Sequence, residues 1–260
     1  MQSSGMLGNF VILGTQRTGS TALYRALNFH RDIACGDEWT LRTAAHRKIK
    51  VTERALSGDF SVLLPRDRML IGKVFSPDTR WLGFKLLFRS SNKWLVHPRV
   101  SPALWLDRFE PFVAWFAARP RIHVIHIVRE DPIEWLKSKY VSDRAKAHSV
   151  KAYPEQITVE IPIRQALKRL VAKRWVDSRL AGLAGSNPYL KISYEEFLRS
   201  DRATVAAMLE FLRCDPSGLG QFDYRKQIRQ SNRSARKYVS NYDQLVEVLG
   251  QEGFLGAGRH

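Results

Sequence analysis

The sequence feature that most constrains the fold is a glycine-rich turn, Gly14–Thr21, which reads GTQRTGST. It follows the apolar run Phe10–Leu13, which predicts a buried strand, and precedes Ala22–Leu27, whose spacing predicts a helix. Glycines let the backbone approach an anion closely, and the N–H groups of a helix's first turn have no partner inside the helix. The segment therefore predicts a phosphate-binding loop.

This turn differs from the ATP-binding P-loop at one position. The P-loop pattern is G-x-x-x-x-G-K-[ST], and Ser20 stands here at the position of the lysine. Without that lysine the turn lacks the charge that contacts the outer phosphates of a nucleotide. Its one cation is Arg17, three residues nearer the strand. The sequence therefore argues against hydrolysis of ATP or GTP.

Strand and helix patterns alternate along the rest of the chain. Short apolar or aromatic runs predict strands at Trp81–Phe88, Ile122–Val128 and Tyr189–Ser193. Helical spacing predicts helices at Leu104–Ala118, Asp131–Ser142, Arg164–Leu183, Tyr194–Leu198, Arg202–Leu212 and Tyr242–Leu249. This alternation predicts a P-loop-like α/β fold of three layers, in which helices flank a central parallel β-sheet and ligands bind beyond the carboxyl ends of the strands.

The chain of 260 residues has no linker or low-complexity segment that would divide it. We therefore expect a single domain over residues 1–260. Residues 42–80 form its least regular part, with Pro65 and Pro77 as breaks. They are the candidate for an acceptor-binding insertion or lid.

The chain is strongly basic, with 42 Lys and Arg against 25 Asp and Glu and a net charge of +17. Such a surplus attracts nucleic acids, anionic lipids, acidic glycans and highly phosphorylated cofactors alike. The basic residues are scattered along helical segments, and neither a zinc-finger spacing nor an RNA-recognition signature occurs. The sequence therefore argues against nucleic acid as the primary partner.

Cysteine usage and the N-terminus bear on the compartment. Cys35 and Cys214 do not make a disulfide framework in a chain of this length, so reduced thiols are expected. Residues 1–7 lack the regions of a signal peptide, and no apolar run approaches the roughly 20 residues that span a bilayer. We expect a cytoplasmic location with no transmembrane segment, and peripheral contact with a membrane stays open.

Two histidines in one predicted strand raise the question of a metal. His123 and His126 are three residues apart, and this spacing along a strand places them on opposite faces of the sheet. We therefore predict no metal site.

Two short motifs point to a family. The run Arg17-Thr18-Gly19-Ser20-Thr21 resembles the 5′-phosphosulfate-binding loop of sulfotransferases that use PAPS (3′-phosphoadenosine 5′-phosphosulfate), and its arginine resembles the carbohydrate and bacterial branches. Arg129 after a predicted strand and Ser138 on the next helix resemble the family's 3′-phosphate motif, whose guanidinium and hydroxyl suit a phosphate. Their spacing of nine exceeds the commoner pattern by one, because Glu130-Asp131 stands where one residue is usual. The alternative is that Arg129 only pairs with one of these carboxylates.

Two further stretches extend the resemblance. Leu190–Leu198 is similar to the family's strand followed by Tyr-Glu, which implies that Tyr194 lies near the adenine. Arg229–Asp243 is similar to a C-terminal basic loop that closes over the cofactor, which implies a role for Arg233. Arg236 and Lys237 are alternatives to Arg233, as is a solvated basic face.

The resemblance implies transfer of a sulfuryl group from PAPS to a hydroxyl, with release of PAP and with no obligatory metal. Arg17 and the loop N–H groups would stabilise the departing PAP. Lys85, in the predicted strand Trp81–Phe88, is a further catalytic candidate, although a lysine that only extends from a strand end to solvent explains it nearly as well.

The base that accepts the proton of the hydroxyl is either a histidine or a carboxylate in this family. Carbohydrate-type members place a glutamate just beyond the first helix, where Glu38 stands here. A carboxylate between apolar Trp39 and anionic phosphates should have a raised pKa, which suits a base. Asp37 is the nearest substitute, and the histidine alternatives are His46 and His97.

The function implied is therefore sulfation of a hydroxyl on a carbohydrate, lipid or small metabolite. Two rivals stay open at this point: a non-catalytic protein that binds polyanions or nucleic acid, and an atypical P-loop nucleotide kinase. The identity of the acceptor and the oligomeric state do not follow from the sequence.

Overall fold

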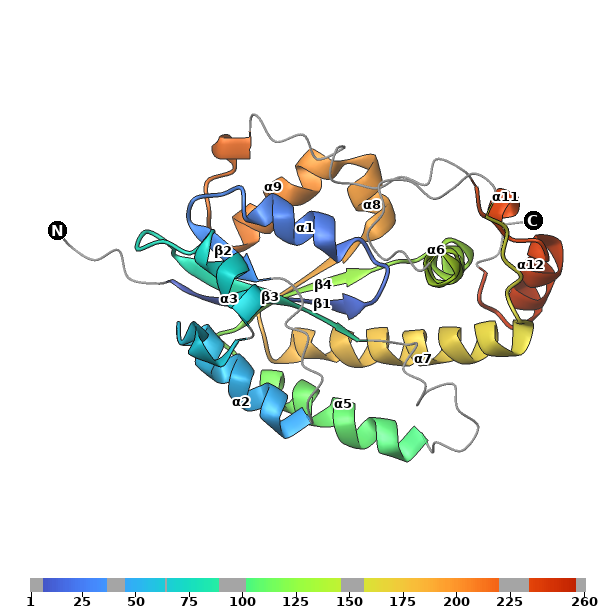
Figure 1. Cartoon of the computed structure of the whole chain (residues 1–260), viewed down its shortest axis with the longest axis horizontal. Coiled ribbons are helices and arrows are strands. Elements are labelled where there is room, and N and C mark those ends of the chain that lie inside the picture. Colours follow the sequence, from blue (N-terminus) through green and yellow to red (C-terminus); the bar gives the residue numbers. More distant parts are fainter. Residues whose placement is uncertain are drawn as a thin grey trace.

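The computed structural model describes residues 7–36, 45–63, 65–88, 102–145, 157–219 and 234–255. Within them, five parallel strands form one sheet in the order β2-β3-β1-β4-β5. The strands are β1 (Gly8–Thr15), β2 (Ile33–Gly36), β3 (Trp81–Phe88), β4 (His123–Val128) and β5 (Tyr189–Ser193). Helices cover both faces of the sheet (Figure 1), so the predicted three-layer α/β fold is confirmed.

The central strand β1 determines where a ligand can bind. Its core residues Phe10–Leu13 are fully buried, because helices cover both faces of the sheet. A parallel strand covered on both sides is typically a continuous apolar run, as the sequence indicated. From β1 the chain builds β2 and β3 on one side and β4 and β5 on the other. The carboxyl end of β1 therefore lies at the switch point of the sheet, where ligands bind in folds of this kind.

One face of the sheet is covered by α1 (Ser20–Leu27), α8 (Tyr194–Arg199) and α9 (Asp201–Phe211). Leu23 and Leu27 of α1 belong to the same buried cluster as residues of β1 and α9. This packing holds α1 against the sheet with its first turn directly after β1.

The other face is covered by α2 (Ala45–Leu56), α3 (Pro65–Gly72), α5 (Pro102–Ala117) and α7 (Ile163–Ala181). The description of residues 42–80 as irregular was wrong, because α2 and α3 lie there. Ala55 and Ile71 from these helices are fully buried in the core. Whether the segment contacts an acceptor stays a prediction.

A third buried cluster lies beyond the carboxyl end of β4 (Figure 1). It joins α6 (Pro132–Arg144) and the first half of α7 to the C-terminal helices α11 (Ala235–Tyr238) and α12 (Tyr242–Gln251). Trp135 and Leu136 of α6 are fully buried there. The C-terminal part of the chain therefore packs beside the same edge of the sheet as the phosphate loop.

The remaining differences from the sequence analysis are small. The predicted helices and strands occur, with ends that move by a few residues. Strand β2 was missed because its four residues are too few to show a period. Short 3₁₀ turns lie at Phe60–Val62, Gly182–Gly185 and Pro216–Leu219. Among the described residues, no helix has both the length and the apolar character needed to cross a bilayer.

Candidate active site

The turn after β1 has the backbone of an anion-binding loop. Arg17 and Gly19 have positive φ angles of 70° and 80°, and Gly19 is the N-cap residue of α1. A Cβ atom on Gly19 would lie 2.4 Å from the ring of Tyr194. A side chain is therefore excluded at Gly19, whereas Arg17 adopts a conformation that residues other than glycine rarely occupy. Such backbone strain clusters at functional sites.

Three donors hold the carbonyl groups of this loop. The Thr18 hydroxyl donates to the Thr15 carbonyl at 2.9 Å, and the Trp135 indole N–H donates to the Gln16 carbonyl at 2.8 Å. Arg129 Nη1 donates to the Arg17 carbonyl at 3.3 Å. The loop conformation is therefore fixed in part by α6 and by Arg129, the residue that follows β4.

Lys85 supplies a positive charge next to the first turn of α1. It lies on β3 and is buried, and its Nζ donates to the Thr21 hydroxyl at 3.1 Å. The same Nζ is 4.9 Å from the centre of the Tyr24 ring. Lys85 therefore does not extend to solvent, and its charge lies beside a loop that lacks the P-loop lysine.

Arg129 follows β4 and is 9% exposed. Its guanidinium lies over the Tyr194 ring at 4.7 Å and donates from Nη2 to Glu134 Oε2 at 3.3 Å. The alternative of a pair with Glu130 or Asp131 is not what the structure has. Its Nε is buried, and among the described residues it has no hydrogen-bond partner. A buried donor of this kind requires an explanation.

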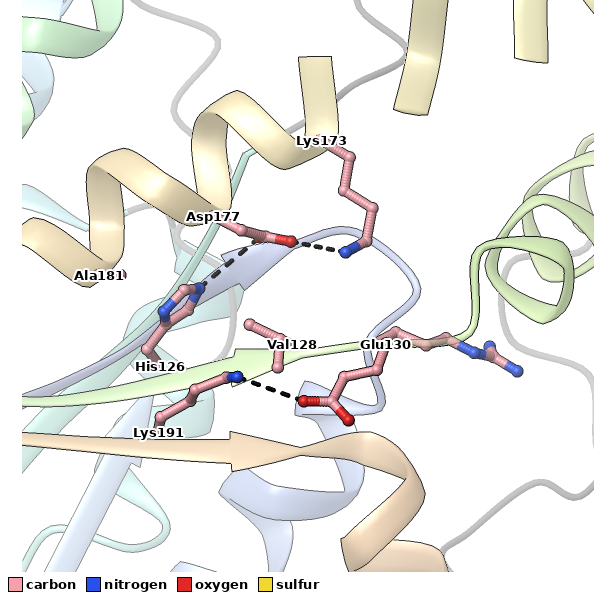
Figure 2. A pocket seen from close by; sticks show the side chains of 8 residues that line it. His126, Val128, Glu130, Lys173, Asp177, Ala181 and Lys191 are labelled. Carbon is pink, nitrogen blue, oxygen red and sulfur yellow. Dashed lines mark hydrogen bonds and ion pairs between the residues drawn. The ribbon is translucent and has the colours of Figure 1, made fainter. Parts of the chain in front are cut away.

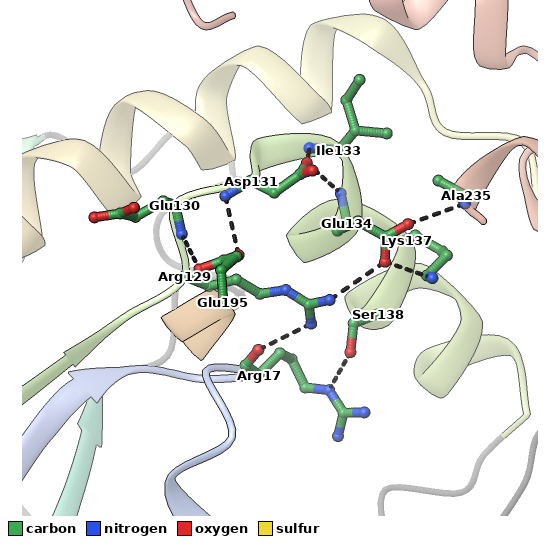
Figure 3. A network of polar contacts seen from close by, with 10 residues as sticks. All are labelled: Arg17, Arg129, Glu130, Asp131, Ile133, Glu134, Lys137, Ser138, Glu195 and Ala235. Atoms are coloured by element: carbon green, nitrogen blue, oxygen red, sulfur yellow. Dashed lines mark hydrogen bonds and ion pairs between the residues drawn. The ribbon is translucent and has the colours of Figure 1, made fainter. Parts of the chain in front are cut away.

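The two predicted anion motifs meet in one place. Arg17 Nε donates to the Ser138 hydroxyl at 3.1 Å across 121 positions of sequence (Figure 3). The additional residue between Arg129 and Ser138 lies ahead of Pro132, where α6 begins, so it does not alter the position of Ser138 within the helix. The nine-residue spacing is therefore compatible with a shared site.

Tyr194 contacts both predicted anion-binding motifs, the loop after β1 and Arg129. Its ring contacts the position of Gly19 and stacks on Arg129. Burial raises the pKa of its hydroxyl, so Tyr194 stays a neutral hydrogen-bonding group at physiological pH. That Tyr194 lies near the adenine of a bound nucleotide stays a prediction.

Several candidates lie outside the described part of the chain. They are Glu38, Asp37, His97 and Arg233. His46 belongs to α2, but its side chain is not among those described. The identity of the base therefore stays a prediction.

The structure also brings in residues that the sequence analysis missed. Glu134 pairs with Arg129, and the Glu195 carboxylate accepts the backbone N–H groups of Glu130 and Asp131 at 3.0 and 3.2 Å. The Asp131-Pro132 start of α6 was recognisable as a helix cap, and it placed Glu134 in the first turn. The partners of Glu134 and Glu195 come from distant segments, so no local pattern indicated them.

A cavity of about 240 Å³ lies on the α7 side of β4 and β5, lined in part by His126, Asp177 and Lys173 (Figure 2). Lys173 pairs with Asp177 at 2.6 Å, and Lys191 pairs with Glu130 at 3.2 Å. Within each pair the positive and the negative charge offset each other. Arg129 also lines this cavity and donates to the Arg17 carbonyl, so the cavity adjoins the site through Arg129.

The two histidines of β4 point to opposite faces, as expected. His123 packs on Trp81, with ring centres 4.6 Å apart, and His126 is hydrogen-bonded to Tyr189 at 2.6 Å. Elsewhere in the described chain, His30, Asp32 and Cys214 lie close enough to suggest a metal.

In this group of three residues, both ring nitrogens of His30 already have hydrogen-bond partners within the protein. His30 Nδ1 accepts the Asp32 N–H at 3.2 Å, and its Nε2 lies 3.1 Å from the Asp215 carbonyl. Burial, with a smaller contribution from Asp32, raises the pKa of the Cys214 thiol to about 11. The absence of a metal site stays a prediction.

Comparisons with known proteins agree with this geometry. The sequence profile described as the Sulfotransferase family matches residues 9–217. No curated protein sequence gave a significant match.

The matches among solved structures are weak and of low identity. The sulfotransferase from Alicyclobacillus acidocaldarius is 16% identical, with a TM-score of 0.42 over 81% of this chain and 82% of that chain. The sulfotransferase domain of the Synechococcus PCC 7002 olefin synthase is 14% identical, with a TM-score of 0.45 over 98% of this chain and 91% of that chain. Retinol dehydratase, solved with androsterone and the inactive cofactor PAP, is 12% identical, with a TM-score of 0.36 over 99% and 73%.

The family profile spans most of the chain and includes the phosphate loop, Arg129, Ser138 and Tyr194. The chain therefore belongs to the Sulfotransferase family, and sulfuryl transfer is its general activity.

Proposed function

We propose that this protein transfers the sulfuryl group of PAPS to the hydroxyl of an acceptor. The observation that carries the proposal is the contact between the two anion motifs, with Arg17 Nε donating to Ser138 and Arg129 donating to the Arg17 carbonyl. A nucleotide that carries phosphate groups at both the 5′ and the 3′ positions of its ribose matches two guanidinium groups whose residues are in direct contact.

The residues at the site fit such a donor. Among the described residues the buried Nε of Arg129 has no hydrogen-bond partner, and the loop leads directly into the first turn of α1, whose N–H groups suit an anion. In this proposal the loop Arg17–Thr21 holds the 5′-phosphosulfate, and Arg129 with Ser138 holds the 3′-phosphate. The ring of Tyr194 packs on the guanidinium of Arg129. Arg233 is proposed as a further contact to the nucleotide.

The chain's residues also account for the chemistry. PAPS, when bound, supplies the sulfuryl group and leaves as PAP. Arg17 and Lys85 would neutralise the negative charge that develops on the phosphate oxygen as its bond to sulfur breaks and the bond from the acceptor oxygen forms. Glu38 is the proposed base that takes the hydroxyl proton, with Asp37, His46 and His97 as alternatives. No step in this scheme requires a metal.

The donor assignment is tested by calorimetry with PAP and with AMP, which differ by the 3′-phosphate alone. Charge-assisted hydrogen bonds from Arg129 should favour PAP by about 10- to 100-fold. The basic charge of the protein attracts both nucleotides, so it does not create this preference by itself. Equal affinities would refute the donor assignment, and strong salt-sensitive binding of DNA without a PAP preference would favour a polyanion binder.

The base is tested by Glu38→Gln. We expect this variant to lose turnover by at least about 100-fold and to keep its affinity for PAP, because general-base catalysis typically contributes 10²- to 10⁴-fold. The measurement is single-turnover transfer of radiolabelled sulfuryl together with calorimetry. Normal turnover would move the role to one of the alternatives.

The acceptor is proposed only as a class: a hydroxyl on a carbohydrate, a lipid or a small metabolite. The positive charge of the chain suits an acidic glycan or an anionic lipid headgroup, and it allows peripheral contact with a membrane. A cytoplasmic location and a single domain over residues 1–260 belong to the same proposal. Screening hydroxyl compounds with radiolabelled PAPS would identify the acceptor.

A further inference from the structure

The carboxylate of Glu134 joins three segments of the chain (Figure 3). Its Oε2 accepts from Arg129 Nη2 at 3.3 Å and lies 2.5 Å from Lys137 Nζ. Its Oε1 accepts the backbone N–H of Ala235 at 3.0 Å. One side chain on α6 therefore contacts the end of β4, its own helix and the beginning of α11.

Glu134 completes the set of contacts that orient Arg129. The guanidinium donates to the Arg17 carbonyl with Nη1 and to Glu134 with Nη2, and its face lies on the Tyr194 ring. Three contacts in different directions leave a planar group little freedom to rotate. The donor edge at Nε is thereby kept in one direction.

The same carboxylate holds the C-terminal segment against α6. Ala235 and Tyr238 are buried, and Lys137 Nζ lies 5.8 Å from the Tyr238 ring centre. Burial lowers the pKa of Lys137, and the hydrogen bond that Lys137 donates to Glu134 opposes this shift. Without Glu134, the buried cations Lys137 and Arg129 would lose the anion between them.

We propose that Glu134 is a positioning residue that aims Arg129 at the 3′-phosphate and makes this recognition depend on the docking of Ala235–Tyr238. This inference rests on the proposed function, because it assumes that Arg129 contacts a 3′-phosphate. It assigns to the C-terminal segment an effect on nucleotide selection that acts through the Ala235 N–H.

The effect of removing the Glu134 carboxylate on the affinity for PAP distinguishes a positioning role from a purely electrostatic one. A carboxylate beside a phosphate site repels the phosphate, so its removal by charge alone would strengthen binding of PAP. If Glu134 instead positions Arg129, its removal weakens binding of PAP. The sign of the change therefore decides between the two roles.

The experiment compares Glu134→Gln with Glu130→Gln in the full chain. Glu130 is adjacent to Arg129 in sequence, but its carboxylate is 56% exposed and pairs with Lys191. We expect Glu134→Gln to lower the preference for PAP over AMP by about tenfold, and we expect Glu130→Gln to keep it within about twofold. An unchanged or larger preference in Glu134→Gln would overturn the positioning role.

A second variant tests the link to the C-terminal segment and does not alter any charge. Ala235→Pro removes the N–H that Glu134 accepts, at the first residue of α11, where proline is tolerated. Ser234 before it has ψ 154°, which is compatible with a following proline. We expect the preference for PAP to fall about threefold, and an unchanged preference would overturn the link.

Thermal unfolding of each variant shows whether it folds, and Ala235→Pro keeps the inference testable if Glu134→Gln does not fold. The preference ratio is the deciding measurement, because general loosening of the structure affects PAP and AMP alike. A wild-type protein without any preference for PAP would refute the proposed function. A wild-type preference that both variants retain would refute this inference alone.

Discussion

The two halves of the site are built in different ways. The loop half is one continuous segment, Gly14–Thr21, whose shape depends on positive φ angles and on the start of α1. The strand-end half combines Arg129 with Glu134 and Ser138 of α6, and it depends on Tyr194 and Ala235 from distant segments. The loop half takes its shape mainly from its own backbone, with Trp135 and Arg129 holding two of its carbonyl groups, whereas the strand-end half takes its side chains from several segments and is sensitive to each of them.

The largest expected effect separates the two halves by function. Arg17→Ala should lower the rate of sulfuryl transfer by about 100- to 1,000-fold, because in the proposed mechanism Arg17 would stabilise charge that develops during the reaction. Arg129→Ala should instead raise the Kd for PAP by about 10- to 100-fold and leave the Kd for AMP nearly unchanged. Single-turnover rates and calorimetry measure the two quantities.

The matched control for these variants is Arg31→Ala. The Arg31 side chain is 91% exposed and lies beyond the far end of α1. It should change neither the transfer rate nor the affinity for PAP. If Arg17→Ala and Arg129→Ala altered the same quantity to the same extent, the division of the site into a reacting half and a recognising half would be wrong.

A substitution at Gly19 should have a smaller effect, and it should disturb both halves of the site. A methyl group on Gly19 would meet the Tyr194 ring at 2.4 Å, at a φ of +80° that already disfavours a side chain. We expect Gly19→Ala to destabilise the protein by about 2 kcal/mol in chemical denaturation and to weaken PAP binding, because a displaced Tyr194 no longer supports Arg129.

Gly72→Ala is the control for that variant, because a Cβ at Gly72 has nothing within 4 Å. Its stability should stay within about 0.5 kcal/mol of the wild type. Adding Tyr194→Ala to Gly19→Ala should remove the steric part of the penalty. If the loss of stability in the double variant equals or exceeds the sum of the losses in the two single variants, Tyr194 does not connect the two halves.

The smallest effect lies outside the site and appears only at high pH. Burial is the main cause that raises the pKa of the Cys214 thiol from 9.0 to about 11 and the pKa of the Tyr189 hydroxyl from 10.0 to about 12. The unfolded chain releases these protons at lower pH than the folded chain, so stability decreases as pH rises from about 9 to 12. Denaturant midpoints measured across this range should show the decrease.

Single substitutions assign the two contributions. Cys214→Ala should remove the part of the decrease between about pH 9 and 11, and Tyr189→Phe should remove the part between about pH 10 and 12. Transfer activity at neutral pH should not change, because neither residue contacts Arg17 or Arg129. A pH dependence that both variants leave intact would refute these assignments.

Much of the fold followed from local patterns. The fully buried run of β1 and the Asp131-Pro132 cap of α6 are short-range signals, and both elements occur where they were predicted. By contrast, β2 has four residues, and α2 and α3 lie in a segment whose prolines suggested breaks. Pro65 is the first residue of α3, where proline favours a helix rather than ending it.

The sequence by itself determined the strand, turn and helix around Gly14–Thr21 and the parallel α/β class, because hydrophobic spacing and turn residues carry these features. The phosphate-binding roles of the loop and of Arg129 with Ser138 stay predictions. Only the tertiary structure decided that Lys85 reaches Thr21, that Arg17 contacts Ser138 and that Glu134 joins Arg129 to Ala235. Parallel strands bring residues that are far apart in sequence to one edge of a sheet. The direction of each side chain at that edge is then set by packing, which no local pattern records.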